Sequence, residues 1–373
     1  ELAKIGEVAT NSQIGGRRNI IINGAMQVAQ RGTTTGQGNA SAYSAVDRMN
    51  IHGGSTAGRL TSSQDSDSPV FFGNSLKLDC TTADTSIAAG EFLLLEQKLE
   101  GQDLQQLEFN QSSAKATTIS FYVKGNAAAQ YTFALQYHLA SGTARWFTKG
   151  FAVTTDWARI TITIPGDTQA SDGSNYGIAD NNATGANLMI WLHGGTNFSS
   201  GTHQDTAWAD RDYTTLFQDN QTSFYDSTNR TFFFTGFQFE LGSQATPFEH
   251  LSFGETLALA QRYFETSYVV GTAIGASSQH SKGPVFANSH TNNAYNSAGE
   301  PRWNTRKRAT PTVVIYNSNT GTVNSIYNHD SGANKAISSI TDISEVGFGL
   351  IYHASAMGAG YRYQYHYTAD SEL

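Results

Sequence analysis

The chain has 373 residues, of which 14% are charged and 12% aromatic, and its formal net charge is −8. This length allows two domains with cores of their own, and the aromatic content excludes a disordered chain. The acidic balance argues against nucleic acid as a partner, because phosphate binding draws on a basic surface. Cys80 is the single cysteine, which excludes an intrachain disulfide and a zinc site of clustered cysteines. No apolar run approaches the roughly 18 residues of a membrane-spanning helix, so we expect no membrane insertion.

Residues 1–18 predict a tether or the end of a coiled segment, because Leu2, Ile5 and Ala9 have helical spacing before a Gly-Gly pair. From Asn19 onward, apolar and polar residues alternate in short runs bounded by turn residues, which predicts strands. Regular short strands of this kind indicate a β-sandwich over 19–250. The runs lie at 19–33, 74–80, 117–126, 131–139, 157–167, 187–193 and 230–242.

A connecting helix is predicted at 251–265, where Ser252 and Glu255 have the spacing of a capping box and apolar residues share one face. After this helix the strand pattern resumes. We therefore expect a second, sandwich-like β domain at 266–373, with strands at 267–274, 311–317, 335–340, 345–353 and 361–367.

Every second residue of the closing strand is a tyrosine, from Tyr361 to Tyr367. We expect this face to line the core of the second domain or a threefold seam, where each ring buries area and keeps its hydroxyl bonded at an edge. A platform for sugar rings is the alternative. If the tyrosines are buried, the residues between them project outward or toward another chain: Arg362, Gln364 and His366.

Two long loops, at about 277–308 and 317–334, carry the residue types that recognise sugars, namely flat aromatic rings and planar polar groups. Their candidate receptor-binding residues are Trp303, Tyr295, His290, Asn292, Tyr327 and His329. For Trp303, the alternative is a ring that anchors its loop.

A basic run in the first loop suggests contact with phosphate or acidic sugars, since guanidinium groups match such oxyanions. Arg302 and Arg306 are the binding candidates, and Lys307 and Arg308 follow them. The alternative is a solvated or intersubunit cluster that pairs with acidic residues.

Catalytic motifs are absent: the sequence has no His-Glu-x-x-His helix, no Gly-x-Ser-x-Gly elbow and no phosphate-binding glycine loop. We therefore predict no enzyme, no catalytic residues, no metal and no cofactor. A pair of glycosidase carboxylates is spatial and stays open as an alternative to loop and cap roles, with candidates Asp156, Asp205, Asp210 and Asp212. The segment 172–182 is rich in oxygen ligands but lacks the spacing of a calcium loop.

Five pieces of the chain occur in the order seen in carbohydrate-binding-module jelly rolls of the galactose-binding-like kind, which they resemble. The pieces are "NGAM" at 23–26, "GNSLKLDC" at 73–80, "SFYVKG" at 120–125, "DWARITITIPGD" at 156–167 and "GFQFELG" at 236–242. The resemblance implies a jelly roll at 19–250. Such jelly rolls often hold calcium with carboxylates in the first and last strands. Here Gly236 stands where an Asp is usual and leaves only Glu240, so we expect no calcium site.

A second resemblance spans nearly the whole chain from Asn19. The segments resemble tail-fibre proteins of tailed bacteriophages, especially marine ones, in which a block like "FQFELGSQATPFEHLSFGETLALAQRYFE" joins a jelly roll to a C-terminal domain. The other matching segments are 17–33, 46–49, 307–316 and 367–373. Ala260 stands where such blocks commonly have Cys, which leaves packing unchanged because free Cys behaves as a small apolar residue.

This resemblance implies a homotrimeric segment of a virion tail fibre, assembled in the cytoplasm of a bacterial host and joined to an upstream fibre segment or a tail adaptor. Its tip at 266–373 would attach the phage to a host surface glycan or protein receptor by non-catalytic binding. One alternative is a glycan depolymerase of a tailspike, which the absence of β-helix repeats disfavours. Another alternative is a structural virion protein without a ligand.

Overall fold

The computed structural model describes residues 17–168, 176–203, 205–218, 221–277, 284–288, 295–296, 301–353 and 360–373. The coil or tether predicted for the N-terminus falls almost entirely outside these residues. The chain divides into two compact units: the first comprises Glu1–Gln27, Thr33–Leu251 and Leu373, and the second comprises Val28–Gly32 and Ser252–Glu372. The strands of both units pair antiparallel, so the prediction of an all-β chain is confirmed.

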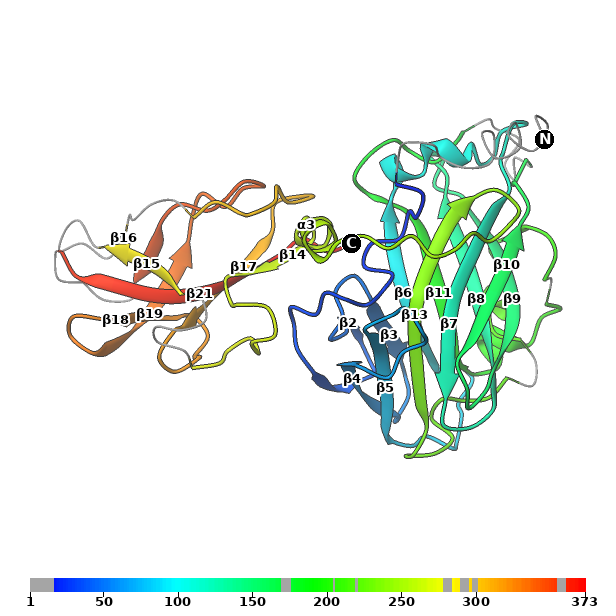
Figure 1. Cartoon of the computed structure of the whole chain (residues 1–373), viewed down its shortest axis with the longest axis horizontal. Helices are drawn as coiled ribbons and strands as arrows, with labels where there is room; N and C mark the ends of the chain where they lie inside the picture. Colours follow the sequence, from blue (N-terminus) through cyan, green and yellow to red (C-terminus); the bar gives the residue numbers. More distant parts are fainter. Residues whose placement is uncertain are drawn as a thin grey trace. The chain divides into compact units, whose positions relative to one another are not determined.

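The first unit is a sandwich of two antiparallel sheets (Figure 1). The six-stranded sheet has the order β1 (Thr34–Gln37), β4 (Arg59–Asp65), β5 (Ser75–Thr82), β13 (Thr231–Leu241), β7 (Thr117–Gly125) and β10 (Ala158–Ile164). The seven-stranded sheet has the order β12 (Ala209–Asp210), β9 (Ala144–Val153), β8 (Ala129–His138), β11 (Thr184–Gly194), β6 (Phe92–Glu100), β3 (Asn50–Gly54) and β2 (Ser41–Tyr43). Short helical turns connect them: η1 (Gly101–Asp103), η2 (Gln105–Leu107), α2 (Thr196–Ser199) and η3 (Tyr213–Thr215).

Alternation along the strands produces the core between these sheets. Inward residues such as Phe121 on β7, Phe133 on β8 and Ile190 on β11 belong to one large apolar cluster and are almost fully buried. Their neighbours along each strand point to the outer faces of the sheets, because successive side chains of a strand alternate. The outer face of the seven-stranded sheet is therefore free to carry polar residues.

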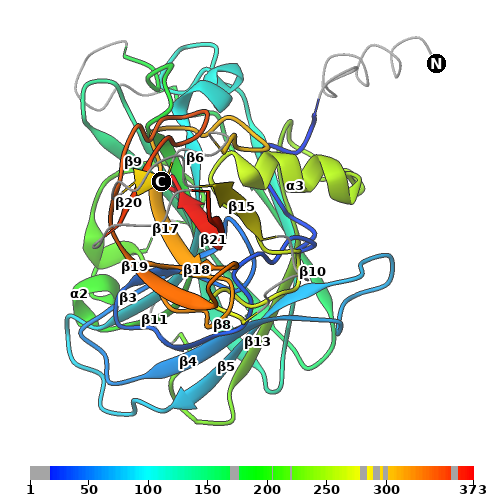
Figure 2. The same ribbon diagram turned by 90° about the vertical axis from the view of Figure 1, so that its left-hand side faces the viewer.

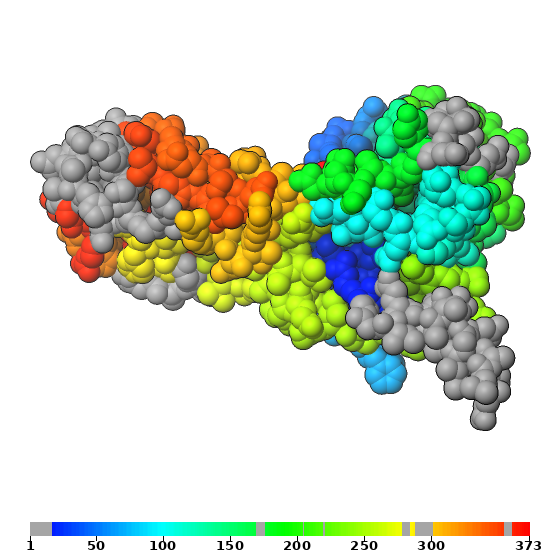
Figure 3. All heavy atoms as spheres, turned by 90° about the horizontal axis from the view of Figure 1, so that it is seen from above, coloured from blue at the N-terminus to red at the C-terminus, as the bar shows by residue number. Residues whose placement is uncertain are grey.

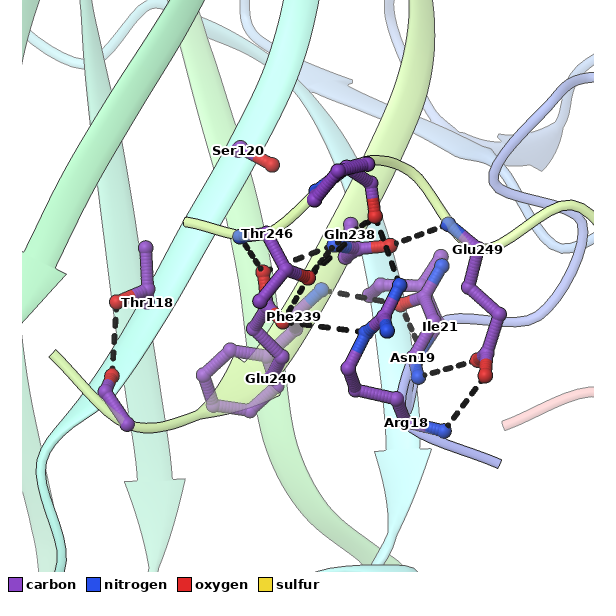
Figure 4. Close-up of polar contacts among 12 residues, drawn as sticks. Arg18, Asn19, Ile21, Thr118, Ser120, Gln238, Phe239, Glu240, Thr246 and Glu249 are labelled. Carbon is purple, nitrogen blue, oxygen red and sulfur yellow. Dashed lines mark hydrogen bonds and ion pairs between the residues drawn. The ribbon is translucent and has the colours of Figure 1, made fainter. Parts of the chain in front are cut away.

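Residues 19–22 do not form the strand predicted for them. Hydrogen bonds to side chains hold this segment in place instead (Figure 4). Glu249 accepts the backbone N–H groups of Arg18 at 3.1 Å and Asn19 at 2.7 Å. Asn19 Oδ1 in turn accepts the N–H of Phe239 on β13 at 3.0 Å. Glu240 accepts the N–H of Thr246 at 2.9 Å and its hydroxyl at 2.6 Å. Within the described chain, the carboxylates of the "ELGSQATPFE" motif thus close the sandwich.

The turn between β4 and β5 presents two apolar side chains to solvent. Val70 is 78% exposed and Phe71 is 88% exposed. Phe71 has a φ of 75°, a left-handed conformation that suits glycine, and the N–H of Phe72 closes the turn on Pro69 O at 3.0 Å. The light-blue segment around residue 70 stands out from the surface of the first unit in Figure 3.

The second unit centres on its last strand, β21 (Arg362–Asp370), shown with its neighbours in Figure 2. β14 and β15 pair along one edge of β21, and β17 and β18 pair along the other. The other elements are α3 (Phe253–Gln261), β14 (Phe264–Thr266), β15 (Val285–Asn288), β16 (Tyr295–Asn296), β17 (Thr312–Asn317), β18 (Ser325–Asn328), β19 (Ala333–Ile340) and β20 (Ile351–His353). No helix in the described part of the chain is long and apolar enough to cross a membrane.

Several predicted boundaries in this unit are wrong. The helix begins as expected, with a complete capping box between Ser252 and Glu255, but it ends at Gln261 and the chain turns directly into β14. No strand forms over 267–274, and only Ile351–His353 of the predicted run at 345–353 is a strand. Conversely, β18 and the start of β19 occupy part of the predicted loop at 317–334.

The tyrosines of β21 largely line the core, as one of the two interpretations predicts. Tyr363, Tyr365 and Tyr367 are nearly fully buried in the core cluster of this unit, whereas Tyr361 is 39% exposed. For the other face, the prediction is wrong for Gln364 and His366, which are completely buried, and is confirmed for Arg362, which is exposed. The His366 ring stacks on Tyr268 with ring centroids 3.7 Å apart. With partners along both edges and packing on both faces, β21 is an interior strand.

Candidate functional site

Trp303 is a core residue of the second unit. Its ring is 7% exposed and packs against Phe348 and Tyr367, and its indole N–H donates to Ser344 O at 2.9 Å. The ring therefore anchors its loop, as the alternative reading has it, and offers no open face to a sugar.

The four basic residues of the run do not converge on one surface. Lys307 is fully buried, with Nζ 2.6 Å from the carboxylate of Glu265, which is also fully buried. Arg306 forms a surface ion pair with Glu345 at 2.6 Å, and Arg308 donates to the backbone carbonyl oxygens of Ser371 and Glu372. Pairing with acidic residues and carbonyl groups accounts for this part of the basic run.

Arg302 is exposed and lines a pocket of about 110 Å³ in the second unit. The other lining residues are Pro301, Asp342, Ser344, Gly347, Phe348 and Gly349. Neighbouring backbone groups already satisfy one another: Ser344 N–H donates to Gly347 O and Gly349 N–H donates to Thr341 O. The charged side chains that line this pocket are those of Arg302 and Asp342.

The remaining loop candidates fall into two groups. His290 and Asn292 lie outside the described residues, and of Tyr295 the structure describes only the backbone, which pairs in β16 with β20. Tyr327 and His329 are partly exposed neighbours whose ring centroids lie 6.5 Å apart. The structure thus brings these last two together and does not unite them with Trp303.

The carboxylates considered for glycoside cleavage have structural partners. Asp205 pairs with Lys149 at 2.6 Å, and Asp210 pairs with Arg145 at 2.6 Å. Asp212 caps η3: its carboxylate accepts the hydroxyl and the backbone N–H of Thr214, and these contacts, the hydroxyl first, lower the pKa of Asp212. Asp156 is exposed. Among the described residues, no group of three or more His, Cys, Asp or Glu side chains is arranged to hold a metal ion.

A row of polar side chains crosses the outer face of the seven-stranded sheet in the first unit. We name it the polar row and define it by Ser41, Asn50, Glu96, Asn187 and His138, which belong to five adjacent strands: β2, β3, β6, β11 and β8. Hydrogen bonds link every member to the next. Asn50 Nδ2 donates to Ser41 Oγ at 2.9 Å and to Glu96 Oε1 at 2.8 Å. Asn187 Nδ2 donates to Glu96 Oε2 at 3.2 Å, and His138 Nε2 lies 3.2 Å from Asn187 Oδ1.

Strand register explains why these residues meet. Asn50 pairs directly with Glu96 across β3 and β6. Asn187 on β11 pairs with Lys98, which is two residues beyond Glu96 on β6. The side chain of Asn187 therefore lies on the same face as that of Glu96 and diagonally across from it. Their strand neighbours, such as Leu95 and Leu188, face the core, so the polar residues must face outward.

The row combines rigid and accessible members. Asn50 is 1% exposed and Glu96 3% exposed, whereas Ser41, Asn187 and His138 reach solvent. Burial lowers the pKa of His138 more than its hydrogen bond to Asn187 raises it, so the imidazole is neutral at pH 7 and can accept as well as donate. Asn50 Oδ1 has no hydrogen-bond partner within the described chain.

Two tryptophans lie on the same outer face. Trp146 on β9 pairs in register with Gln136 on β8, so it lies on the strand next to the one that carries His138 of the polar row. Trp146 and Trp191 belong to a second apolar cluster, and neither indole N–H has a hydrogen-bond partner within the described residues. Burying an indole N–H without an acceptor is unfavourable. This face therefore carries two indole N–H donors, beside the polar row, that could donate to a ligand.

Sequence reasoning missed this site. The run at 187–193 reads as apolar throughout, which hid the outward position of Asn187. The available signal was the interruption of apolar strands by planar polar residues, Asn50 and Glu96 among them. Such a signal gains meaning only when strand order and register are known.

No family model matches the chain, and no curated protein matches it either. Solved structures similar to it include the CBM22-1 xylan-binding domain of Paenibacillus barcinonensis Xyn10C, at 12% identity, covering 62% of this chain and 100% of that domain with a TM-score of 0.28. A family 30 carbohydrate-binding module matches at 13% identity over 60% of this chain and 92% of its own, with a TM-score of 0.28.

The enzymatically active domain of bacteriophage CBA120 tailspike protein 4 is a third similar structure. It matches at 10% identity over 60% of this chain and 21% of its own, with a TM-score of 0.28. At such low identities and TM-scores, these likenesses decide nothing about what this chain binds, and the functional proposal rests on its own residues.

Proposed function

We propose that this chain is a tail-fibre adhesin of a bacteriophage, which attaches the virion to its host by non-catalytic binding of a surface glycan. Its resemblance to tail-fibre proteins supports the biological setting. The polar row supports the binding chemistry, and it is the single observation that carries the proposal.

The chemistry of the row suits a polyhydroxylated ligand. Sugar hydroxyls both donate and accept, and they are recognised by planar amides, carboxylates and imidazoles held at fixed spacing. Asn187 and His138 supply such groups at the surface, and the buried carboxylate of Glu96 fixes both flanking amides. Because the row lies on rigid strands, little ordering free energy is lost on binding.

The first experiment screens purified protein against host polysaccharides and glycan arrays, and then measures affinity by calorimetry. Asn187→Ala removes a surface amide of the row and should weaken glycan binding by about 1–3 kcal/mol, or roughly 5- to 150-fold. Asn229→Ala, an exposed change on the segment before β13, is the matched control and should leave affinity unchanged. Equal affinity of both variants and the parent would place the binding site elsewhere.

Two further measurements separate the alternatives. An adhesin competes with phage adsorption and produces no new reducing ends from host polysaccharide. A depolymerase produces new reducing ends. A structural protein without a ligand neither competes with adsorption nor produces reducing ends. We further propose a homotrimer, because three weak sites on one fibre raise avidity without any new contact. Light scattering after size-exclusion chromatography should give three times the chain mass of 40.3 kDa, and a monomeric mass would contradict it.

A further inference from the structure

Glu91, His193 and Ser223 form a hydrogen-bonded trio in the first unit, apart from the polar row. Glu91 immediately precedes β6, His193 lies near the end of β11, and Ser223 lies in the segment that leads to β13. His193 Nδ1 is 2.8 Å from Ser223 Oγ, and His193 Nε2 is 3.3 Å from the Glu91 carboxylate.

The arrangement fixes where the protons lie. A carboxylate only accepts hydrogen bonds, so Nε2 of the neutral imidazole carries the proton and donates to Glu91. Nδ1 is then an unprotonated acceptor, and the Ser223 hydroxyl donates to it. The Tyr225 N–H donates to Ser223 Oγ at 3.0 Å, which leaves the serine proton directed at His193. Burial is the largest effect on His193 and lowers its pKa, so the imidazole stays neutral at pH 7.

Exposure within the trio matches its division of roles. His193 is fully buried and Glu91 is 5% exposed, whereas Ser223 is partly exposed. Glu91 is thus a positioning residue, His193 a shielded base and Ser223 the accessible hydroxyl. In the described part of the chain, the backbone N–H of Ser223 donates to no acceptor, so it is available to an oxygen that binds at this serine.

We propose that Ser223 is an activated nucleophile that attacks carboxylic esters with a small acyl group, with His193 as its general base. This activity goes beyond the proposed glycan binding and does not depend on it. Ser223 is only partly exposed, which favours a compact acyl group over a bulky one at Oγ.

The step balances as an acyl transfer. Ser223 Oγ forms a bond to the carbonyl carbon while its proton passes to His193 Nδ1. The ester C–O bond then breaks, and the leaving alkoxide takes that proton from His193. Water hydrolyses the acyl-serine, using His193 again as the base, and releases the carboxylic acid. In most serine hydrolases the serine faces Nε2 and the carboxylate faces Nδ1. Here the serine faces Nδ1 and the carboxylate faces Nε2. His193 can still accept and return the serine proton, because both nitrogens belong to one conjugated ring.

A fluorophosphonate probe tests the proposal on the full chain, since it modifies serines that are activated as nucleophiles. Labelling is located by peptide mass spectrometry, and hydrolysis of p-nitrophenyl acetate is measured in parallel. The labelled peptide should carry the probe on Ser223, and S223A should lower hydrolysis about 100-fold or more, to the background rate. E91Q should keep the fold and lower the labelling rate about tenfold, because the imidazole loses its charged orienting partner.

Ser227 provides a matched control in the same segment. Its Oγ likewise accepts a backbone N–H two residues on, from Asn229 at 3.2 Å, but within the described residues no histidine contacts its exposed side chain. S227A should label and hydrolyse like the parent. Ser223 that labels no faster than Ser227, or an S223A variant with full hydrolysis, would overturn the proposal. Thermal melting of each variant separates loss of activity from loss of fold.

Discussion

Lys307 and Glu265 form an ion pair in which both side chains are 0% exposed, and removal of the lysine tests whether this pair holds the second unit together. In Lys307→Ala, Glu265 keeps three neutral donors, namely the Asn304 N–H, the Asn304 side-chain amide and the Tyr367 hydroxyl. Glu265 loses Lys307, its one cationic partner within the described part of the chain, which lies at 2.6 Å. The Gln261 carbonyl oxygen also loses its donor.

The expected cost is about 3–5 kcal/mol, because an uncompensated charge remains in an apolar interior. Burial lowers the pKa of Lys307 more than the attraction of Glu265 raises it, and a penalty of this kind is expected for a charge kept away from water. This loss is a large part of the roughly 5–15 kcal/mol that stabilises a typical domain. Urea unfolding monitored by circular dichroism measures it directly, and calorimetry should show a Tm lowered by roughly 10–20 °C.

Two further variants serve as controls for this prediction. Arg306→Ala breaks the exposed pair with Glu345 and should cost at most about 1 kcal/mol, because water screens that pair. The double variant Glu265→Gln with Lys307→Met removes both charges and should recover most of the loss. The reasoning is wrong if Lys307→Ala costs no more than Arg306→Ala, or if the double variant loses as much as the sum of the single changes.

Three further outcomes follow from the structure. Phe71→Gly should stabilise the first unit by up to about 1 kcal/mol in urea unfolding, because the left-handed backbone and the exposed ring are both unfavourable. Glu249→Ala should cost about 1–3 kcal/mol of unfolding free energy in the same assay, because the backbone N–H groups of Arg18 and Asn19 lose their acceptor. Burial lowers the pKa of His353 and of His366 to about 4, so the unfolded chain binds more protons and stability should fall as pH drops from about 6.5 to 4. Each His contributes up to about 3 kcal/mol. His353→Phe should flatten that pH dependence, and an unchanged slope would contradict it.

The sequence predicted strands well where one face is apolar and the other polar. β7, β8 and β10 occur where their alternation placed them. It located β21 as a strand but failed to predict that the polar residues of β21 are buried, because polar residues on a strand look solvent-facing until their partners are known. In β21, Gln364 accepts from Ser318 at 3.4 Å and His366 bonds Ser267 at 3.0 Å, so both can be buried. These partners come from 46 and 99 residues away and leave no local signal.

The candidate site was harder to predict because it depends on strand order. Asn50, Glu96 and Asn187 come from β3, β6 and β11, and the chain passes through β7, β8, β9 and β10 between the last two. A one-residue shift in the pairing of β11 with β6 would turn Asn187 into the core. Trp303 failed as a sugar candidate for the opposite reason: a tryptophan in a loop sequence gives no sign of whether the loop folds back over a core.

The location of the polar row also bears on what the tail-fibre resemblance can mean. The segment that carries most of that resemblance has an observable structural purpose here: Glu240 and Glu249 close the sandwich, and Ser252 and Glu255 start α3. A sequence block that builds the fold in this way can be shared by proteins that bind different receptors. On the function proposed above, specificity then resides in residues outside the block, such as Asn187 and the other surface members of the row. Relatives with the same block and different residues at these row positions should therefore differ in the glycans that they bind.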